Sequence, residues 1–279
     1  MVCDCHMHMV LDGIDWRAAI GRHSRQVDEA FVRRALAVYR EKGYCYLRDG
    51  GDRWGVGELA RSLAGEYGIT YRTPLAPLCK KGHYGAFIGE TYENLREYLD
   101  LVKKIRKNGG DFIKIMISGL MDFNQFGVLT EPGLEKSEIL ELIHIAHSEG
   151  FAVMAHCNGA RTAEAAAEAG VDSIEHGAYL DADALAAMQE KGVVWVPTLS
   201  TVGNLQGKGR FEETAVREIL RSSMENLRKY SRMGGLIACG SDAGAWAVPH
   251  GCDTELQWLL QVAEEETIAK GNRRIVEKF

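Results

Sequence analysis

Short apolar stretches rich in β-branched and aromatic residues alternate along the chain with longer segments of mixed apolar and charged residues. The short stretches have the length of buried strands, and in the longer segments apolar residues recur every three or four positions, as in amphipathic helices. Eight strands are predicted: Val2–Cys5, Tyr44–Asp49, Thr70–Ala76, Phe112–Ile117, Ala152–His156, Ser173–His176, Val193–Pro197 and Leu236–Ser241. Eight helices are predicted between and after them: Asp28–Lys42, Val56–Tyr67, Tyr92–Lys107, Lys136–Glu149, Ala160–Ala169, Ala182–Lys191, Glu213–Arg232 and Asp253–Lys270.

Glycine follows several predicted helices just before the next strand, as at Gly43, Gly150 and Gly192. A left-handed residue at this position ends a helix, and glycine adopts that conformation without strain. The regular alternation of strands and helices predicts a parallel sheet. Eight strand–helix pairs in 279 residues favour an α/β fold of the (β/α)8 TIM-barrel type over an open, doubly wound sheet. The pairs fill residues 1–279, which predicts a single domain.

Composition narrows the class of protein. Hydrophobic residues make up 46% and charged residues 26% of the chain, which is ordinary for a globular protein and excludes general disorder. The 33 basic and 39 acidic residues leave a net charge of −6, so a nucleic-acid partner is not expected. No apolar run reaches the roughly 18 residues of a membrane span, and no signal peptide is recognised at the start. Seven cysteines, several inside apolar runs, indicate reduced thiols and a cytoplasmic location.

Residues able to bind metal ions lie at or near the ends of the predicted strands, with Lys114 within the fourth strand. They are His6, His8, Lys114, His156, His176 and Asp242. In a barrel the carboxyl ends of the strands converge on one mouth, so side chains far apart in the sequence would meet there. The pair His6 and His8 would share one face of its strand, because side chains alternate with a period of two. Two neutral imidazoles on one face can bind a single divalent ion.

Each of these residues also has an ordinary structural interpretation. Lys114, within FIKIMISG, could extend its ammonium to solvent from an outward position. Facing the interior, its pKa would fall, and reaction with carbon dioxide would turn the amine into an anionic oxygen ligand. His156 and His176 could be core histidines, and Asp242 could be a turn or capping residue. The grouping of all six at strand ends favours a metal site.

The sequence resembles the amidohydrolase superfamily. The matching segments are HMH at 6–8, IKIMISG at 113–119, AHCNG at 155–159, AGVDSIEHG at 169–177, VPTL at 196–199 and GSDAG at 240–244. They follow one another in order over nearly the whole predicted barrel. The similarity is greatest to the prolidase-like and imidazolonepropionase-like branch, whose members have a binuclear metal centre.

The resemblance implies a metal-dependent hydrolase that cleaves an amide, peptide, lactone or ester bond of a small molecule. His6, His8 and Asp242 would hold one divalent ion, and His156 and His176 would hold the second. Lys114, carboxylated by carbon dioxide, would bridge the two ions together with the hydroxide that attacks the substrate. Asp242 would be the catalytic proton shuttle. Zinc is the first expectation for the metal, and Mn, Fe or Co would suit the same ligands.

Members of that branch usually carry a small β-sandwich built from both ends of the chain. Residues 1–279 are accounted for by the barrel, so we expect a barrel that lacks this sandwich. The lower end of the first strand would then be exposed. A second copy of the chain could cover it, which makes a homo-oligomer an expected form.

The loops after the strands are expected to contact the substrate. Four residues are predicted as contacts: His83, Arg161, Tyr179 and His250. Each is also compatible with an ordinary loop position. An arginine or lysine in these loops could bind a carboxylate of the substrate.

Two other functions remain open at this point. One is a mononuclear deaminase or decarboxylase of the same superfamily. The other is a non-catalytic metal-binding barrel. Metal content near one or near two ions per chain would separate the mononuclear enzyme from the binuclear hydrolase.

Overall fold

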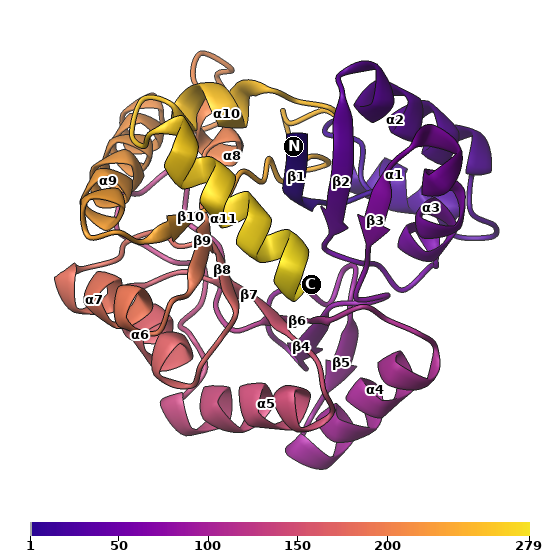
Figure 1. Cartoon of the computed structure of the whole chain (residues 1–279), viewed down its shortest axis with the longest axis horizontal. Helices are drawn as coiled ribbons and strands as arrows, with labels where there is room; N and C mark the ends of the chain where they lie inside the picture. The colour runs from indigo at the N-terminus through magenta and orange to yellow at the C-terminus, as the bar shows by residue number, and fades with distance from the viewer. Residues whose placement is uncertain (1) are drawn as a thin grey trace.

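A computed structural model describes residues 2–279, in which parallel strands form a ring and helices surround it (Figure 1). The strands are β1 Val2–Met7, β2 Tyr44–Asp49, β3 Thr70–Arg72, β4 Leu78–Lys80, β5 Glu90–Tyr92, β6 Ile113–Met116, β7 Val153–Cys157, β8 Ser173–His176, β9 Val194–Val196 and β10 Leu236–Ile237. The helices are α1 Trp16–His23, α2 Glu29–Glu41, α3 Val56–Ala64, α4 Leu95–Lys107, α5 Lys136–Ser148, α6 Ala160–Glu168, α7 Ala182–Glu190, α8 Ser200–Gly203, α9 Glu213–Arg232, α10 Thr254–Leu259 and α11 Glu265–Lys278. A 3₁₀ turn, Gly65–Tyr67, follows α3.

The strands form two sheets with parallel pairing throughout. One sheet has the order β1-β2-β3 and the other the order β10-β9-β8-β7-β6-β4-β5. The backbone N–H of Cys5 donates to the carbonyl of Cys239 at 2.8 Å, which joins the sheets beside β1. The sheets also meet between β3 and β6, where the N–H of Asp111 donates to the carbonyl of Thr73 at 3.0 Å. The fold is therefore of the predicted TIM-barrel type, built from two sheets rather than one continuous ladder.

The helices form for local reasons and pack their apolar faces inward. In α4, the side chain of Asn94 caps the first turn by accepting the N–H of Glu97. Tyr98, Val102 and Ile105 recur at helical spacing and are buried. They belong to the large core cluster between the outer helices and the outward faces of the strands.

Helix α11 covers the amino ends of the strands. It packs against β10, β9 and β1, and Figure 1 shows it crossing the face of the ring toward the viewer. Ile275 and Phe279 join a buried cluster with Cys3, Phe112 and Val194, which lie at or near the start of their strands. The amino ends are thereby closed, and the carboxyl ends remain for a site.

Several predicted boundaries were wrong. The predicted helix Asp253–Lys270 is two helices, since α10 ends at Leu259 and α11 begins at Glu265. The predicted strand Thr70–Ala76 ends at Arg72, because Pro74 cannot donate to a ladder and Leu75 has a positive φ of 65°. The short elements α1, α8, β4 and β5 were not predicted. Within residues 2–279, no helix has both the length and the apolar character to cross a membrane.

Candidate metal centre

One cavity of about 550 Å³ brings together all six residues predicted as metal ligands. It lies at the carboxyl ends of the strands and is lined by His6, His8, Lys114, His156, His176 and Asp242, among others. All six residues are at least nine-tenths buried. The convergence of strand ends that the barrel fold requires has therefore gathered residues from five separate segments of the chain.

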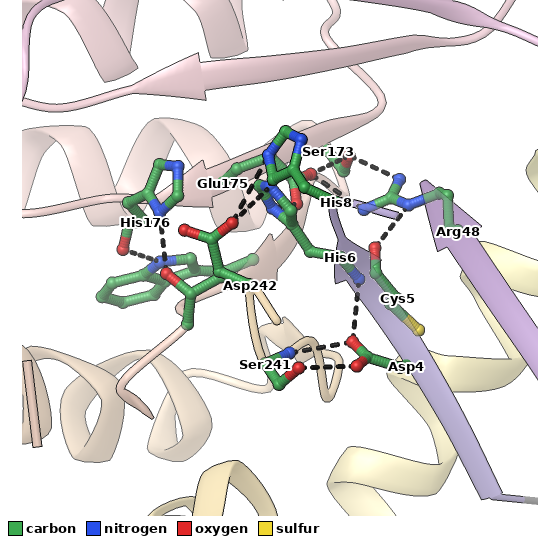
Figure 2. Close-up of polar contacts among 12 residues, drawn as sticks. Asp4, Cys5, His6, His8, Arg48, Ser173, Glu175, His176, Ser241 and Asp242 are labelled. Carbon is green, nitrogen blue, oxygen red and sulfur yellow. Dashed lines mark hydrogen bonds and ion pairs between the residues drawn. The ribbon is translucent and has the colours of Figure 1, made fainter. Parts of the chain in front are cut away.

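Three of these side chains form a compact triangle (Figure 2). Nε2 of His6 lies 3.4 Å from Nε2 of His8, and Oδ1 of Asp242 lies 3.4 Å from each of these two nitrogens. Two ligands held at about 2.0–2.1 Å from one tetrahedral zinc ion are themselves about 3.3–3.4 Å apart. The spacing of the three atoms fits a single divalent ion. In residues 2–279, this is the one group of three or more His, Cys, Asp or Glu residues with metal-site spacing.

The tautomer of His6 is set by a buried carboxylate. Oε2 of Glu175 lies 2.7 Å from Nδ1 of His6, and a carboxylate only accepts, so Nδ1 carries the proton. The lone pair of His6 is then on Nε2, which faces His8 and Asp242. Arg48 donates from Nη2 to Oε1 of Glu175 at 2.9 Å and from Nη1 to Ser173 at 2.9 Å. This arrangement orients the imidazole as hydrogen-bonded carboxylates do around metal-binding histidines.

The remaining three predicted ligands, Lys114, His156 and His176, line the same cavity. The rings of His156 and His176 are 4.6 Å apart, and the rings of His6 and His176 are 5.1 Å apart. Nε2 of His156 donates to the carbonyl of Gly119 at 3.1 Å, which leaves the lone pair on Nδ1. Nζ of Lys114 is buried with no hydrogen-bond partner. A bare buried amine without a partner is costly, and a bound carbon dioxide would give it polar atoms and a negative charge.

The backbone is strained where two of these residues lie. His176 has a φ of 67° and Asp242 a φ of 57°, values in the left-handed region that non-glycine residues seldom adopt. At His176 this turn breaks the alternation of β8. Glu175 and His176 would otherwise point to opposite faces, whereas both reach His6. Strain of this kind is found where surrounding structure fixes functional side chains.

Glycine makes room for one of the imidazoles. A Cβ on Gly50, which follows β2, would lie only 2.1 Å from Cε1 of His8. The ring of His8 therefore packs directly on the Gly50 backbone, and no other residue fits there without displacing it.

Burial shifts the pKa of each group toward its uncharged form. It lowers the pKa of His8 and of His156 to about 3, so both imidazoles are neutral and able to coordinate. Burial also lowers the pKa of Lys114 to about 8, against the raising effect of Glu175 and Asp242. It raises the pKa of Asp242 to about 8, with the ammonium of Lys114 acting in the opposite direction.

The four predicted substrate contacts are not among the residues that line this cavity. Nδ1 of His83 lies 3.7 Å from a carboxylate oxygen of Glu131, and Arg161 is exposed. The ring of Tyr179 packs edge-on against Phe126. His250 is turned away toward the backbone carbonyl of Leu11, which its Nε2 contacts at 2.9 Å. Their role in binding stays a prediction.

Sequence reasoning missed several residues that shape the site. Glu175 and Arg48 were not singled out, although a lone arginine at the end of an apolar strand, as in YCYLRD, indicates a buried partner. Tyr84, whose ring lies 4.8 Å from that of His156, lines the cavity but was not among the four predicted contacts. Trp16 and Arg17 also line the cavity, and they were missed with helix α1.

The family is shown by comparison with known proteins. Residues 65–269 match the model of the Amidohydrolase family. This chain belongs to the amidohydrolase family. An uncharacterized protein of Mycobacterium tuberculosis is 32% identical over 263 residues, which cover 89% of this chain and 64% of that protein. Ochratoxinase of Aspergillus niger is 27% identical over 198 residues, covering 66% of this chain and 38% of the enzyme. The chain thus spans less than two thirds of the length of these relatives.

Solved structures support the fold. A Xaa-Pro dipeptidase crystallised with methionine in its active site superposes with a TM-score of 0.77 at 20% identity. The match covers 99% of this amidohydrolase chain and 75% of that structure. At this level of identity the likeness establishes the shared architecture alone.

Proposed function

We propose that this amidohydrolase is a metal-dependent hydrolase that cleaves a carbon–nitrogen, ester or lactone bond of a small molecule. The observation that carries the proposal is the triangle of His6, His8 and Asp242, with 3.4 Å between its three ligand atoms. It lies in a cavity whose volume of about 550 Å³ suits a small molecule. Membership in the amidohydrolase family supports hydrolysis as the reaction.

The donor set suits two divalent ions, zinc first and Mn, Fe or Co as alternatives. His6, His8 and Asp242 would hold one ion, and His156 and His176 the other. When bound, such ions polarise a carbonyl oxygen and lower the pKa of a coordinated water. We propose that Lys114 is carboxylated and would offer its oxygens to both ions. Its neutral amine adds to the carbon of carbon dioxide and releases one proton, which gives a carbamate with two ligand oxygens.

Asp242 is proposed to move the proton of the reaction. Its Oδ1 faces the two imidazoles, which leaves Oδ2 to take a proton from the attacking water and return it to the leaving group. In the metal-free chain burial raises the pKa of this carboxyl to about 8, so its surroundings favour the protonated form that proton delivery requires. Glu175 keeps the proton of His6 on Nδ1 and so holds His6 in the tautomer that coordination needs.

The cavity walls are proposed to keep bulk water from the reacting bond. Apolar and aromatic side chains, including Leu11, Tyr84, Phe87 and Met116, line it together with the ligands. In such surroundings electrostatic interactions act more strongly than in water. The polar groups of the proposed metal ligands would then orient the scissile bond.

The test joins metal analysis with a substrate panel. The protein is stripped with a chelator, reloaded with zinc or manganese in the presence of bicarbonate, and assayed on N-acyl amino acids, dipeptides, lactones and p-nitrophenyl esters. We expect about two ions per chain and hydrolysis of at least one class, lost on stripping and restored on reloading. Two bound ions with no turnover on any class would contradict the proposal.

One observation favours the mononuclear alternative. The triangle of His6, His8 and Asp242 alone satisfies metal-site spacing among residues 2–279. A deaminase or decarboxylase with one ion would show a metal content near one per chain even after reloading with bicarbonate present. It would release ammonia or carbon dioxide rather than the two products of amide or ester hydrolysis.

A further inference from the structure

Two arginines from distant loops lie at the same cavity as the candidate metal centre. Arg17 is the second residue of α1, which follows β1, and Arg210 lies between α8 and α9. Both arginines line the cavity, and both are exposed to solvent. Their positions place positive charge at the solvent side of a pocket whose buried end holds the proposed metal ligands.

Each arginine lies against the rings of an aromatic cluster. Cζ of Arg17 is 4.3 Å from the ring centroid of Trp16, which in turn packs edge-on against Phe87. Cζ of Arg210 is 4.4 Å from the ring centroid of Trp246 and 5.4 Å from that of Phe211. Such stacking covers the face of a guanidinium and leaves its N–H edge open for a planar anion.

Apart from this stacking, the polar edges of both guanidinium groups are available. Within residues 2–279, the side chains of Arg17 and Arg210 have no ion pair and no hydrogen bond. The nearby acid Asp15 accepts the backbone N–H groups of Arg17 and Ala18, so its Oδ1 is occupied in capping α1. The two cations therefore keep their capacity to bind an anion from solution.

Several aromatic residues line the same cavity as the arginines. They include Trp16, Phe87, Phe123, Phe211 and Trp246. Trp16 keeps 41% of its surface exposed, which is costly for an indole unless something covers it. An aromatic or broad apolar group would bury these rings, while a small polar substrate would leave them wet.

We propose that Arg17 and Arg210 are specificity-determining residues that bind a carboxylate of the substrate, whose flat apolar portion lies between the two aromatic clusters. The inference rests on the proposed function and narrows it. The substrate class is an amide or ester that carries both a free carboxylate and an aromatic or large apolar group. The carboxylate binds the open guanidinium edges, the apolar group packs on the aromatic rings, and the scissile bond reaches inward toward the metal ligands.

Binding can be tested without catalysis. Isothermal titration calorimetry of the metal-free protein compares N-acetyl-L-phenylalanine with its neutral amide, N-acetyl-L-phenylalaninamide. We expect the acid to bind at least about tenfold more tightly, as one charge-assisted hydrogen bond predicts. Arg17→Gln and Arg210→Gln should each reduce this preference, and the double variant should abolish it. Arg274→Gln, at an exposed position of α11 away from the cavity, is the matched control and should leave it unchanged.

The outcomes separate this inference from the proposed function. Equal affinity for acid and amide, absence of binding, or a preference that survives in the double variant would overturn the arginine site. If the metal-loaded protein still hydrolyses neutral substrates in that case, the proposed function stands alone. If the acid binds through the two arginines and no bond is cleaved by the metal-loaded protein, the proposed function falls and the binding site remains.

Discussion

Glu175 and His6 are 169 positions apart in the sequence and share a buried hydrogen bond of 2.7 Å. The other oxygen of Glu175 pairs with Arg48 at 2.9 Å, and all three side chains are fully buried. Figure 2 shows this chain of contacts leading from Arg48 to the proposed metal ligands. The tautomer of His6, a proposed metal ligand, therefore depends on the buried ion pair between Glu175 and Arg48.

Glu175→Gln should weaken metal binding by about 10–100-fold, because His6 loses the charged acceptor that orients it. Graded chelator titrations read this affinity directly. The variant should also lose about 3–5 kcal/mol of stability, because Arg48 is left buried without its counter-charge. Adding Arg48→Met should restore stability to urea but not metal affinity. Recovery of both in the double variant would mean that Glu175 acts only through folding.

Lys114→Met should abolish the second ion while keeping the fold. The thioether fills similar space, and the buried amine that lacks a partner is removed. Metal analysis should fall from about two ions per chain to one or fewer. Native mass spectrometry of the wild type prepared with bicarbonate should show an added mass of one carbon dioxide, absent in the variant. The same mass in both proteins would refute carboxylation at this position.

The contribution of Lys114 to the stability of the metal-free protein should increase as pH rises from about 8 to 10.5. Burial lowers the pKa of Lys114 from its ordinary 10.5 to about 8, so in this window the lysine binds a proton in the unfolded chain more than in the folded one. The stability of the wild type relative to a variant without the amine then increases with pH. Urea unfolding of the chelated wild type and of Lys114→Met should differ in slope here. Identical slopes would show that the amine is not desolvated.

Asp242→Asn should lower kcat by about 10²–10⁴-fold, the range for loss of a general acid–base. The amide oxygen still offers a ligand, so metal content should change little. Asp100→Asn, at an exposed position of α4, is the control and should leave kcat unchanged. Near-normal turnover in Asp242→Asn with full metal content would remove Asp242 from the proton-transfer role.

Glu255→Gln should flatten the pH dependence of stability between about 4.5 and 8. Burial raises the pKa of Glu255 from 4.5 to about 8, so the folded chain holds a proton that the unfolded chain releases, and stability falls as pH rises. Glutamine is neutral throughout and can still accept the N–H of Ser200. Denaturant unfolding at several pH values measures the slope, with Glu277→Gln at an exposed position of α11 as control.

Gly50→Ala should displace His8 and weaken metal binding, since the new Cβ would lie 2.1 Å from its ring. Gly65→Ala is the matched control, because nothing lies within 4 Å of a Cβ there. We expect the control to be neutral or slightly stabilising, since alanine restricts the unfolded chain. Equal metal affinity in the two variants would show that the ring of His8 moves freely.

The sequence alone determined the elements that depend on local patterns. The predicted strands Tyr44–Asp49 and Ser173–His176 match β2 and β8 residue for residue, because a short buried strand is marked by its own apolar run and by the residues that end it. It also placed the six proposed metal ligands at strand ends, and the barrel type of fold follows from the alternation of elements. That rule of topology is enough to bring all six to one cavity.

Only the tertiary structure decided which residues form hydrogen bonds to those ligands and which residues line the cavity around them. The partner of His6 is Glu175, and Arg17 and Arg210 line one cavity, although no local pattern relates these segments of the chain. The left-handed φ of 67° at His176 is likewise not marked by the sequence, since a histidine seldom adopts it unless the surrounding structure holds it there. Burial is a property of the assembled ring, so the neutral imidazoles and the shifted pKa of Lys114 exist only once distant strands have closed around them.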